Sequence, residues 1–279
     1  MAVWFVTGAS SGLGRAVVEI LLARGDRVAA TARNKDALAG LAGRYPDRVW
    51  TDSMDVTDTN AIRAVVARAF AEFSRIDVIL SNAGRRAFGS AEDLSDEMIS
   101  EQIALHMTGP MQLVRAVLPY LRKQGGGRII QTTGMDAQIG LLGGTVYHAS
   151  KWGAEGFFES LIPEVAPFGI GVTMVAPGNV RTGYGEATVI ADPSEAYAAT
   201  PVGRVGRYLL AHGGNLVASV QGDPVKVAAA IVDSATTDPA PRRIVLGSDA
   251  YLAIHATLTA RLAELEEGRS SAIATDLTG

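Results

Sequence analysis

Tyr147 and Lys151 are the residues of this sequence whose types and spacing best suit acid–base chemistry. They stand four residues apart at the start of a predicted helix, so both side chains lie on one helical face. An ammonium group beside a phenol lowers the phenol pKa, which would make Tyr147 a general acid or base near neutral pH. This spacing is common by chance, and the usual pair is a packing tyrosine beside a surface lysine, so other motifs must decide.

A glycine-rich turn follows the first predicted strand, Val3–Thr7, and opens the first predicted helix. It reads Thr-Gly-Ala-Ser-Ser-Gly-Leu-Gly from Thr7 to Gly14, with the spacing G-x-x-x-G-x-G. Glycines permit a tight turn and let backbone N–H groups and a helix N-terminus approach a pyrophosphate. A glycine turn alone is weak evidence, but its place directly after a strand favours a dinucleotide site.

The end of the second predicted strand indicates which dinucleotide is bound. The segment Ala30–Asn34 carries Arg33 where an NAD-selecting site carries a carboxylate. Arg15, inside the glycine turn, adds a second positive charge, although two solvated surface arginines are the alternative reading. A 2′-phosphate anion suits this environment, so the sequence favours NADP(H).

Short apolar runs alternate with longer helical stretches, which is typical of parallel β-α-β units. We therefore predict an α/β fold of Rossmann type: a doubly wound, seven-stranded parallel sheet with helices on both faces, and a ligand at the carboxyl ends of the strands. The predicted strands are Val3–Thr7, Arg27–Ala32, Val49–Met54, Val78–Ser81, Arg128–Thr133, Gly171–Ala176 and Ile244–Leu246. The predicted helices are Leu13–Arg24, Lys35–Arg44, Thr59–Phe73, Glu97–Arg122, Tyr147–Phe168 and Val225–Ser234.

No break in composition suggests a second domain, so we expect one Rossmann-fold domain over residues 1–279. The longest irregular region runs from about Gly178 to Gly222, and residues 183–222 would form the substrate loop. The chain would end, over residues 249–279, with an amphipathic helix at Leu252–Glu267 and a loose tail at Arg269–Gly279.

Composition narrows the class of protein. The 279 residues are 48% hydrophobic and 19% charged, with a net charge of −4, which argues against disorder and against nucleic acid or an anionic membrane as a partner. The absence of cysteine excludes a thiolate nucleophile, and with only four histidines we expect no metal site. No signal peptide or membrane span is evident, so the expected location is the cytoplasm.

Further motifs accompany the glycine turn and the Tyr147–Lys151 pair: Asp55-Val56, Asn82-Ala83-Gly84 and Pro177-Gly178-x-x-x-Thr182. Together they resemble the short-chain dehydrogenase/reductase family, over roughly Val3 to Leu246. The resemblance implies that Tyr147 is the acid/base and that Lys151 binds the nicotinamide ribose and tunes the tyrosine. It implies that the cofactor contacts Gly8, Ser10, Ser11, Gly12, Leu13, Gly14, Arg15, Arg33, Asp55, Val56, Asn82, Ala83, Gly84, Tyr147, Lys151, Pro177, Gly178, Val180 and Thr182.

Two positions depart from that family pattern. Gly134 stands where the family places a serine that hydrogen-bonds the substrate oxygen, so one donor is missing. Thr133 is the nearest hydroxyl, but it can substitute only if the strand end bulges, because neighbours on a strand point to opposite faces. His106 stands where the family places an asparagine that holds a water relaying protons to the lysine. An imidazole N–H could hold that water, and it could titrate near neutrality.

These observations favour an NADP(H)-dependent oxidoreductase that reduces a ketone or aldehyde or oxidises the matching alcohol. The substrate pocket would be apolar, because its expected rim carries Phe88, Met135, Ile139, Leu141, Leu142, Tyr184 and Tyr197. The candidate substrate residues are Gly134, Met135, Asp136, Gln138 and Tyr184. Two alternatives stay open: an NADP(H)-binding regulator with little catalysis, and a non-carbonyl reaction on the same scaffold, such as imine reduction or epimerisation. By family analogy, the long helices Glu97–Arg122 and Tyr147–Phe168 would build a homodimer or homotetramer.

Overall fold

One parallel sheet organises the computed structural model, which describes residues 1–214 and 221–277. Its seven strands follow the order β3-β2-β1-β4-β6-β7-β9, and every pair of neighbours is parallel. This confirms the predicted Rossmann-type fold, and each predicted strand lies within one residue of the observed bounds. The strands are β1 (Val3–Thr7), β2 (Arg27–Ala32), β3 (Val49–Ser53), β4 (Val78–Ser81), β6 (Gly127–Thr132), β7 (Ile170–Pro177) and β9 (Arg243–Leu246).

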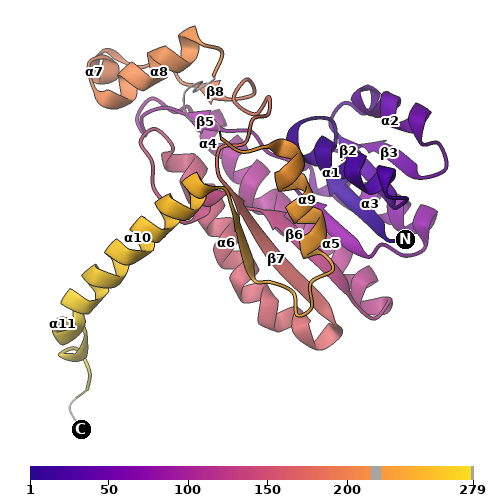
Figure 1. Cartoon of the computed structure of the whole chain (residues 1–279). Helices are drawn as coiled ribbons and strands as arrows, with labels where there is room; N and C mark the ends of the chain where they lie inside the picture. The colour runs from indigo at the N-terminus through magenta and orange to yellow at the C-terminus, as the bar shows by residue number, and fades with distance from the viewer. Residues whose placement is uncertain (215–220, 278–279) are drawn as a thin grey trace.

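Helices cover both faces of this sheet (Figure 1). On one face α1 (Gly12–Ala23) and α9 (Pro224–Ser234) pack over β1 and β2 in one hydrophobic cluster. On the other, α3 (Thr59–Phe73), α5 (Gly109–Lys123) and α6 (Thr145–Val165) build a second cluster. Because both faces are covered, all the residues of β1 and β4 are buried, which is why these strands read as continuous apolar runs.

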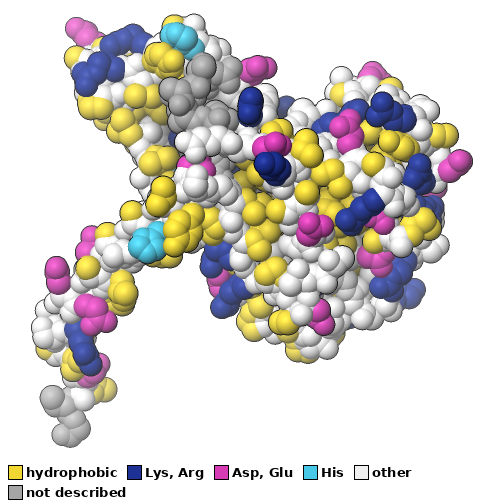
Figure 2. All heavy atoms as spheres, viewed as in Figure 1, with side chains coloured by type: hydrophobic (Ala, Val, Ile, Leu, Met, Phe, Trp, Pro, Cys, Tyr) yellow, Lys and Arg dark blue, Asp and Glu magenta, His cyan; other side chains and the backbone are white. Residues whose placement is uncertain are grey.

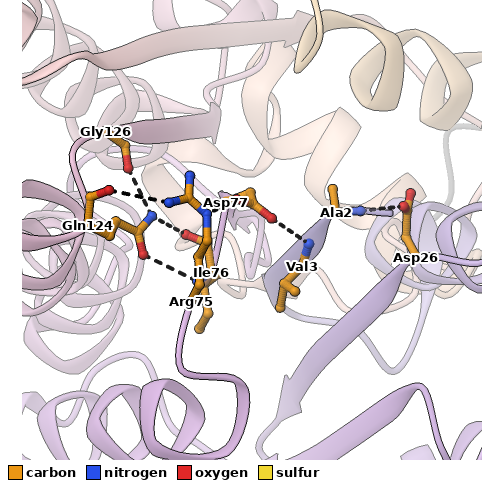
Figure 3. A network of polar contacts seen from close by, with 8 residues as sticks. All are labelled: Ala2, Val3, Asp26, Arg75, Ile76, Asp77, Gln124 and Gly126. Carbon is orange, nitrogen blue, oxygen red and sulfur yellow. Dashed lines mark hydrogen bonds and ion pairs between the residues drawn. The ribbon is translucent and has the colours of Figure 1, made fainter.

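A hydrogen-bonded network ties the strands together at their amino-terminal ends (Figure 3). Asp77 Oδ2 accepts from the Val3 amide at 2.9 Å, and Asp26 Oδ1 accepts from the Ala2 amide at 2.8 Å. Gln124 Nε2 donates to the carbonyls of Ile76 and Gly126 at 2.8 and 2.9 Å. The backbone groups at this edge are therefore satisfied from within, and the carboxyl ends of the strands are the edge at which a ligand site opens.

The predicted helix Glu97–Arg122 is interrupted. The structure has α4 (Asp96–Ile103), a π-helical segment (Ala104–Thr108) and then α5. A Cβ on Gly109, the first residue of α5, would lie 2.4 Å from the Val56 carbonyl oxygen, so the backbones pack closely here. π-Helical turns occur often at functional sites, and this one carries His106.

The region predicted to be irregular, Gly178–Gly222, contains regular elements: β8 (Val189–Ile190), α7 (Glu195–Ala198) and α8 (Pro201–Ala211). Strand β8 pairs in parallel with β5 (Ala87–Phe88) in a small second sheet. The prediction missed β8 because two-residue strands leave no period in the sequence and form only through pairing with a distant segment. It also overlooked the local start signal of α8, the N-cap Thr200 followed by Pro201. Residues 215–220 of the predicted substrate loop lie outside the described residues.

The chain continues past β9 in an arm that projects from the body (Figure 1). It consists of α10 (Ser248–Glu267) and α11 (Arg269–Ile273), so the predicted loose tail is partly helical; residues 278–279 lie outside the described part. Only Ala250 and Ile254 of α10 are buried. Hydrophobic side chains are exposed along the arm (Figure 2), including Leu258 and Leu262, which are 50% and 58% exposed.

The remaining helix, α2 (Ala39–Arg44), follows β2 after the 3-10 turn Lys35–Leu38, where the sequence predicted one helix. None of the helices in the described residues is both long and apolar enough to cross a membrane.

Candidate active site

A cavity of about 450 Å³ opens at the carboxyl ends of β1, β4, β6 and β7. It lies next to the point between β1 and β4 where the strand order reverses, which is where open α/β sheets bind ligands. The predicted site residues that line it are Gly8, Ser10, Ser11, Gly12, Leu13, Arg33, Asp55, Val56, Asn82, Ala83, Gly84, Gly134, Asp136, Tyr147, Lys151, Pro177, Gly178, Val180, Thr182 and Tyr184.

The glycine turn leaves room in this cavity for a phosphate group. A Cβ on Gly8 would lie 2.8 Å from Ala83 Cα, and a Cβ on Gly14 would lie 2.2 Å from the Gly8 carbonyl oxygen, so side chains at these positions would close the turn. Ser11, which precedes α1, makes no side-chain capping hydrogen bond. The first N–H groups of α1 therefore point toward the cavity uncapped, and this cradle fits a pyrophosphate.

Arg33 and Asp55 line the cavity where β2 and β3 end. Burial raises the pKa of Asp55, but hydrogen bonds from Thr57 and the nearby Arg33 charge outweigh it, so the net pKa is lowered and the carboxylate stays ionised. Arg15 does not join them. It forms an ion pair with Glu19 at 2.8 Å, one helical turn along α1, and it does not line the cavity.

Asn82, at the end of β4, links the cofactor side of the cavity to the catalytic side. Its backbone amide donates to Thr7 Oγ1 at 2.9 Å, and Thr132 Oγ1 donates to its side-chain oxygen at 3.3 Å. The Thr132 carbonyl in turn accepts from Lys151 Nζ at 3.1 Å. The ends of β1, β4 and β6 thus position the lysine.

Tyr147 and Lys151 face the cavity together from the first turns of α6, as their spacing predicted. Lys151 Nζ lies 5.7 Å from the centroid of the Tyr147 ring. Burial lowers the pKa of Lys151 to about 8, although Asp136 opposes this. Burial raises the pKa of Tyr147 well above its ordinary value, and Tyr184 and Asp136 raise it further. The expectation of a phenol pKa brought down by the lysine is therefore wrong for this structure, because loss of hydration dominates.

The Tyr184 hydroxyl lies 3.1 Å from the Tyr147 hydroxyl. Tyr184 belongs to the segment after β7, and it lines the cavity together with Tyr147. The sequence placed Tyr184 near the substrate, but no spacing could pair it with Tyr147, because 37 residues separate the two.

Gly134 and Thr133 do not supply the missing serine hydroxyl. Thr133 is fully buried, donates its hydroxyl to the Val175 carbonyl at 3.0 Å and does not line the cavity. The amides of Thr133 and Gly134 both donate to the Val175 carbonyl, at 2.8 and 3.1 Å, so the ladder is irregular at this strand end. The irregularity does not turn the Thr133 hydroxyl into the cavity, so the predicted catalytic role of Thr133 is wrong. Gly134 lines the cavity, with φ 82° and ψ 162°, a backbone conformation almost restricted to glycine.

His106 is almost fully buried, behind the cavity rather than in its lining. Its Nε2 donates to the Arg85 carbonyl at 2.7 Å, and its ring meets the Tyr147 ring edge-on at 5.3 Å. The imidazole N–H was expected to hold a water molecule, but it already donates its hydrogen bond to the Arg85 carbonyl. Burial, and then the Lys151 charge, holds the pKa of His106 well below its ordinary value, so the expectation of titration near neutrality is also wrong.

The substrate side of the cavity is more polar than expected. Met135 packs in a separate hydrophobic cluster, Gln138 donates to Glu155 at 3.4 Å, and neither lines the cavity. Arg85 and Arg86 line it instead, and neither residue was among those predicted from the sequence. Their signal was two consecutive arginines directly after the Asn82-Ala83-Gly84 motif.

Comparison with known proteins decides the family. Residues 2–191 match the family model described as short chain dehydrogenase, which covers more than half of the chain. The chain belongs to the short-chain dehydrogenase family. Members of this family bind a nicotinamide nucleotide and act as oxidoreductases, in agreement with the glycine cradle and the Tyr147–Lys151 pair.

Relatives of this short-chain dehydrogenase cover most of its length. An oxidoreductase, BOA17, from Botryotinia fuckeliana is 36% identical over 89% of each chain. The 3-oxoacyl-[acyl-carrier-protein] reductase FabG of Escherichia coli is 33% identical, over 72% of this chain and 82% of its own. A crystal structure of a short-chain dehydrogenase from Streptomyces avermitilis superposes with a TM-score of 0.90 at 39% identity, covering 99% of this chain and all of that one.

Proposed function

We propose that this protein is an NADP(H)-dependent reductase of ketones or aldehydes, which also oxidises the matching alcohols. The observation that carries the proposal is that Tyr147 and Lys151, with Lys151 Nζ 5.7 Å from the Tyr147 ring centroid, line the same cavity as the glycine cradle. Relatives named as 3-oxoacyl-[acyl-carrier-protein] reductase and 3-ketodihydrosphingosine reductase support a carbonyl substrate.

Tyr147 would donate the proton in the reductive direction. When bound, a reduced nicotinamide would supply the hydride for the carbonyl carbon, and Tyr147 Oη would donate the proton that completes the alcohol. The raised pKa of Tyr147 keeps the phenol protonated at neutral pH, which is the form a proton donor needs. In the oxidative direction the same oxygen accepts the alcohol proton. Lys151, mostly cationic below pH 8, would stabilise the tyrosinate left after each proton donation.

Tyr184 would serve as the second hydrogen-bond donor to the substrate oxygen, in place of the serine that Gly134 replaces. Its hydroxyl is 3.1 Å from the Tyr147 hydroxyl, so one oxygen atom can lie within hydrogen-bonding distance of both. Burial raises the pKa of Tyr184, which keeps its hydroxyl protonated and able to donate. A donor of this kind contributes about 2.7–4 kcal/mol of transition-state stabilisation.

Arg33 would select NADP(H) over NAD(H). It lines the adenosine end of the cavity, and no carboxylate stands at the end of β2 to repel a 2′-phosphate. Two further parts of the proposal rest on the family and the sequence: assembly into a symmetric homodimer or homotetramer, and a cytoplasmic location.

The test is a carbonyl-reduction assay with NADPH and NADH on wild type and tyrosine variants. We expect NADPH to be preferred and Tyr147→Phe to lose at least about a thousandfold in kcat, with Tyr184→Phe losing about a hundredfold. Cofactor binding, followed by nucleotide fluorescence, should be unchanged in both.

Arg33→Ala should lower kcat/KM for NADPH about tenfold or more, whereas Arg15→Ala, which removes a charge already paired with Glu19, should not.

NADPH binding without consumption across ketones, aldehydes and alcohols would overturn the proposal in favour of a binding protein. Full activity in Tyr147→Phe would show that the chemistry does not run through this hydroxyl.

A further inference from the structure

Arg86 places a positive charge directly beside the proposed proton donor. Its guanidinium carbon lies 5.5 Å from the centroid of the Tyr147 ring and 5.9 Å from that of Phe88. Arg86 lines the cavity together with Tyr147, Lys151 and Gly134. It therefore reaches the end of the cavity where the reacting carbonyl would bind, and not the adenosine end near Arg33.

Apart from these two aromatic rings, the guanidinium has no hydrogen-bond or ion-pair partner among residues 1–214 and 221–277. Its Nε atom is buried without a hydrogen-bond acceptor, and no carboxylate stands within ion-pair distance of the side chain. The neighbouring Arg85, by contrast, forms an ion pair with Glu101. A buried hydrogen-bond donor without an acceptor costs about 1–3 kcal/mol of folding free energy. Because Arg86 lines the ligand cavity, we expect the ligand to supply that acceptor.

Local structure holds Arg86 in place. Its backbone carbonyl accepts from the Val189 amide at 2.8 Å, and the next two residues form β5, paired with β8. The Phe88 carbonyl accepts from the Ala191 amide at 2.9 Å, which extends this link. The small sheet thus fixes the Arg86 backbone against the substrate segment, which keeps the base of its side chain at the cavity.

Asp136 is an acidic residue on the substrate side of the cavity, and its carboxylate charge also acts on Tyr147 and Lys151. Its carboxylate lies 3.9 Å from His148 Nε2, and its backbone carbonyl accepts from His148 Nδ1 and Trp152 Nε1, both at 2.9 Å. His148 Nε2 accepts from the Leu141 amide at 3.0 Å, so it does not donate to the Asp136 carboxylate. Among the described residues that carboxylate forms no ion pair with Arg86 either, so the Arg86 charge is left for a ligand.

We propose that Arg86 binds a carboxylate on the substrate, so that the preferred substrates are oxo acids and the corresponding hydroxy acids. This inference rests on the proposed reductase function and names its substrate class. A guanidinium offers two parallel N–H donors that match a carboxylate, and such charge-assisted pairs are strong and directional. The carboxylate would hold one end of the substrate at Arg86 while its carbonyl oxygen lies between the hydroxyls of Tyr147 and Tyr184.

The test compares short 2-, 3- and 4-oxo acids with their methyl esters as substrates for wild type and Arg86 variants. For at least one chain length, wild type should prefer the acid by about tenfold or more in kcat/KM. Arg86→Met should lower kcat/KM for that acid about ten- to a hundredfold, mainly through KM, and leave the ester within about threefold. Arg86→Lys should recover part of the loss, because it keeps the charge but not the paired donors. Arg63→Met, on the exposed surface of α3, removes the same charge and should change neither substrate.

Several outcomes would overturn the inference. If Arg86→Met lowers kcat/KM equally for the acid and the ester, Arg86 acts through Tyr147 rather than on the substrate. Ester turnover without any preference for an acid would refute the carboxylate site and leave the reductase function standing. If no carbonyl compound is reduced, the proposed function itself fails. Calorimetric binding of a short hydroxy acid to wild type with NADP⁺ and to Arg86→Met then still decides the carboxylate site, and equal affinities would refute it.

Discussion

At the scale of single residues, the second hydroxyl of this site comes from a different part of the chain than in the family pattern. Gly134 stands in place of the usual serine, and Thr133 donates its hydroxyl to the Val175 carbonyl. The hydroxyl beside Tyr147 comes from Tyr184, in the segment after β7. The backbone at Gly134, at φ 82° and ψ 162°, does not accommodate a serine without strain. Replacing Gly134 by the serine of the family pattern is therefore not expected to improve this site.

Gly134→Ser should lower the free energy of unfolding by about 1–3 kcal/mol and bring no gain in kcat, because a side chain is disfavoured in this backbone conformation. Chemical denaturation and the reductase assay measure the two effects. Gly140→Ser is the matched control, since Gly140 has an ordinary φ and no neighbouring atom within 4 Å of a new Cβ. A stable Gly134→Ser enzyme with a higher kcat would contradict this reading.

The pH dependence of reduction should follow Lys151 and not His106. Burial lowers the pKa of Lys151 to about 8, so its cation is present below pH 8 and is lost as the pH rises above it. We expect kcat/KM to fall about tenfold per pH unit above pH 8. His106 stays neutral at neutral pH, because burial holds its pKa well below the ordinary value, and so no inflection should occur near pH 6.5.

The pH–rate profiles of wild type and His106→Asn test this expectation. An inflection near pH 6.5 that disappears in His106→Asn would restore a titrating role for the histidine. A profile that stays flat to pH 9 would show that the charge of Lys151 is not required.

At the scale of elements, α6 carries the catalytic pair in its first turns. Farther along the helix, an ion pair fixes α6 to the sheet. Glu155, two turns after Tyr147, accepts from Arg243 Nε at 2.8 Å, and Arg243 also reaches Glu159 at 2.6 Å. Arg243 begins β9, so this ion pair joins the catalytic helix to the edge strand of the sheet. Burial raises the pKa of Glu155, and Arg243 opposes that rise.

Arg243→Met should lower the free energy of unfolding by about 3 kcal/mol at pH 8, because it leaves the buried Glu155 carboxylate without its charged partner. A raised carboxyl pKa means that the folded state binds more protons than the unfolded state, so stability falls as the pH rises. The loss should therefore be smaller at pH 5 than at pH 8, as urea denaturation at both pH values would show.

Arg242→Met is the control for this prediction. Arg242 pairs with Glu159 at 2.8 Å on the surface, and its side chain is 58% exposed, so its removal should cost less than about 1 kcal/mol. If Arg243→Met and Arg242→Met lower the free energy of unfolding equally, the burial of Glu155 does not matter.

At the scale of the whole molecule, the arm leaves an apolar stripe without cover from the described chain. Leu258, Leu262 and Leu265 are spaced by four and three residues and are at least half exposed. They continue the helical face on which Ile254 is buried against the body. A stripe of this kind favours contact with a second copy of the chain, in addition to the contacts expected at α5 and α6.

Size-exclusion chromatography with light scattering should give two or four times the mass of one chain. The double variant Leu258→Glu and Leu262→Glu should lower that mass if the arm takes part in assembly, whereas Leu252→Glu, on another face of α10, should not. An unchanged mass in the double variant would assign assembly to α5 and α6 alone, and a monomeric wild type would contradict the proposed assembly.

The sequence by itself determined the sheet, the glycine turn and the Tyr147–Lys151 pair. These are set by local patterns: apolar runs specify buried strands, and a four-residue spacing places two side chains on one helical face. The cofactor residues came from the family resemblance, and all of them except Gly14 and Arg15 line the cavity at the carboxyl ends of the strands.

Only the tertiary structure decided which side chains surround the Tyr147 hydroxyl. Tyr184 and Arg86 reach it from segments held together by β5 and β8, whose pairing depends on distant residues rather than on any local period. The pKa values of Tyr147, Lys151 and His106 depend on burial by the whole fold, so the spacing of the catalytic pair could not predict them.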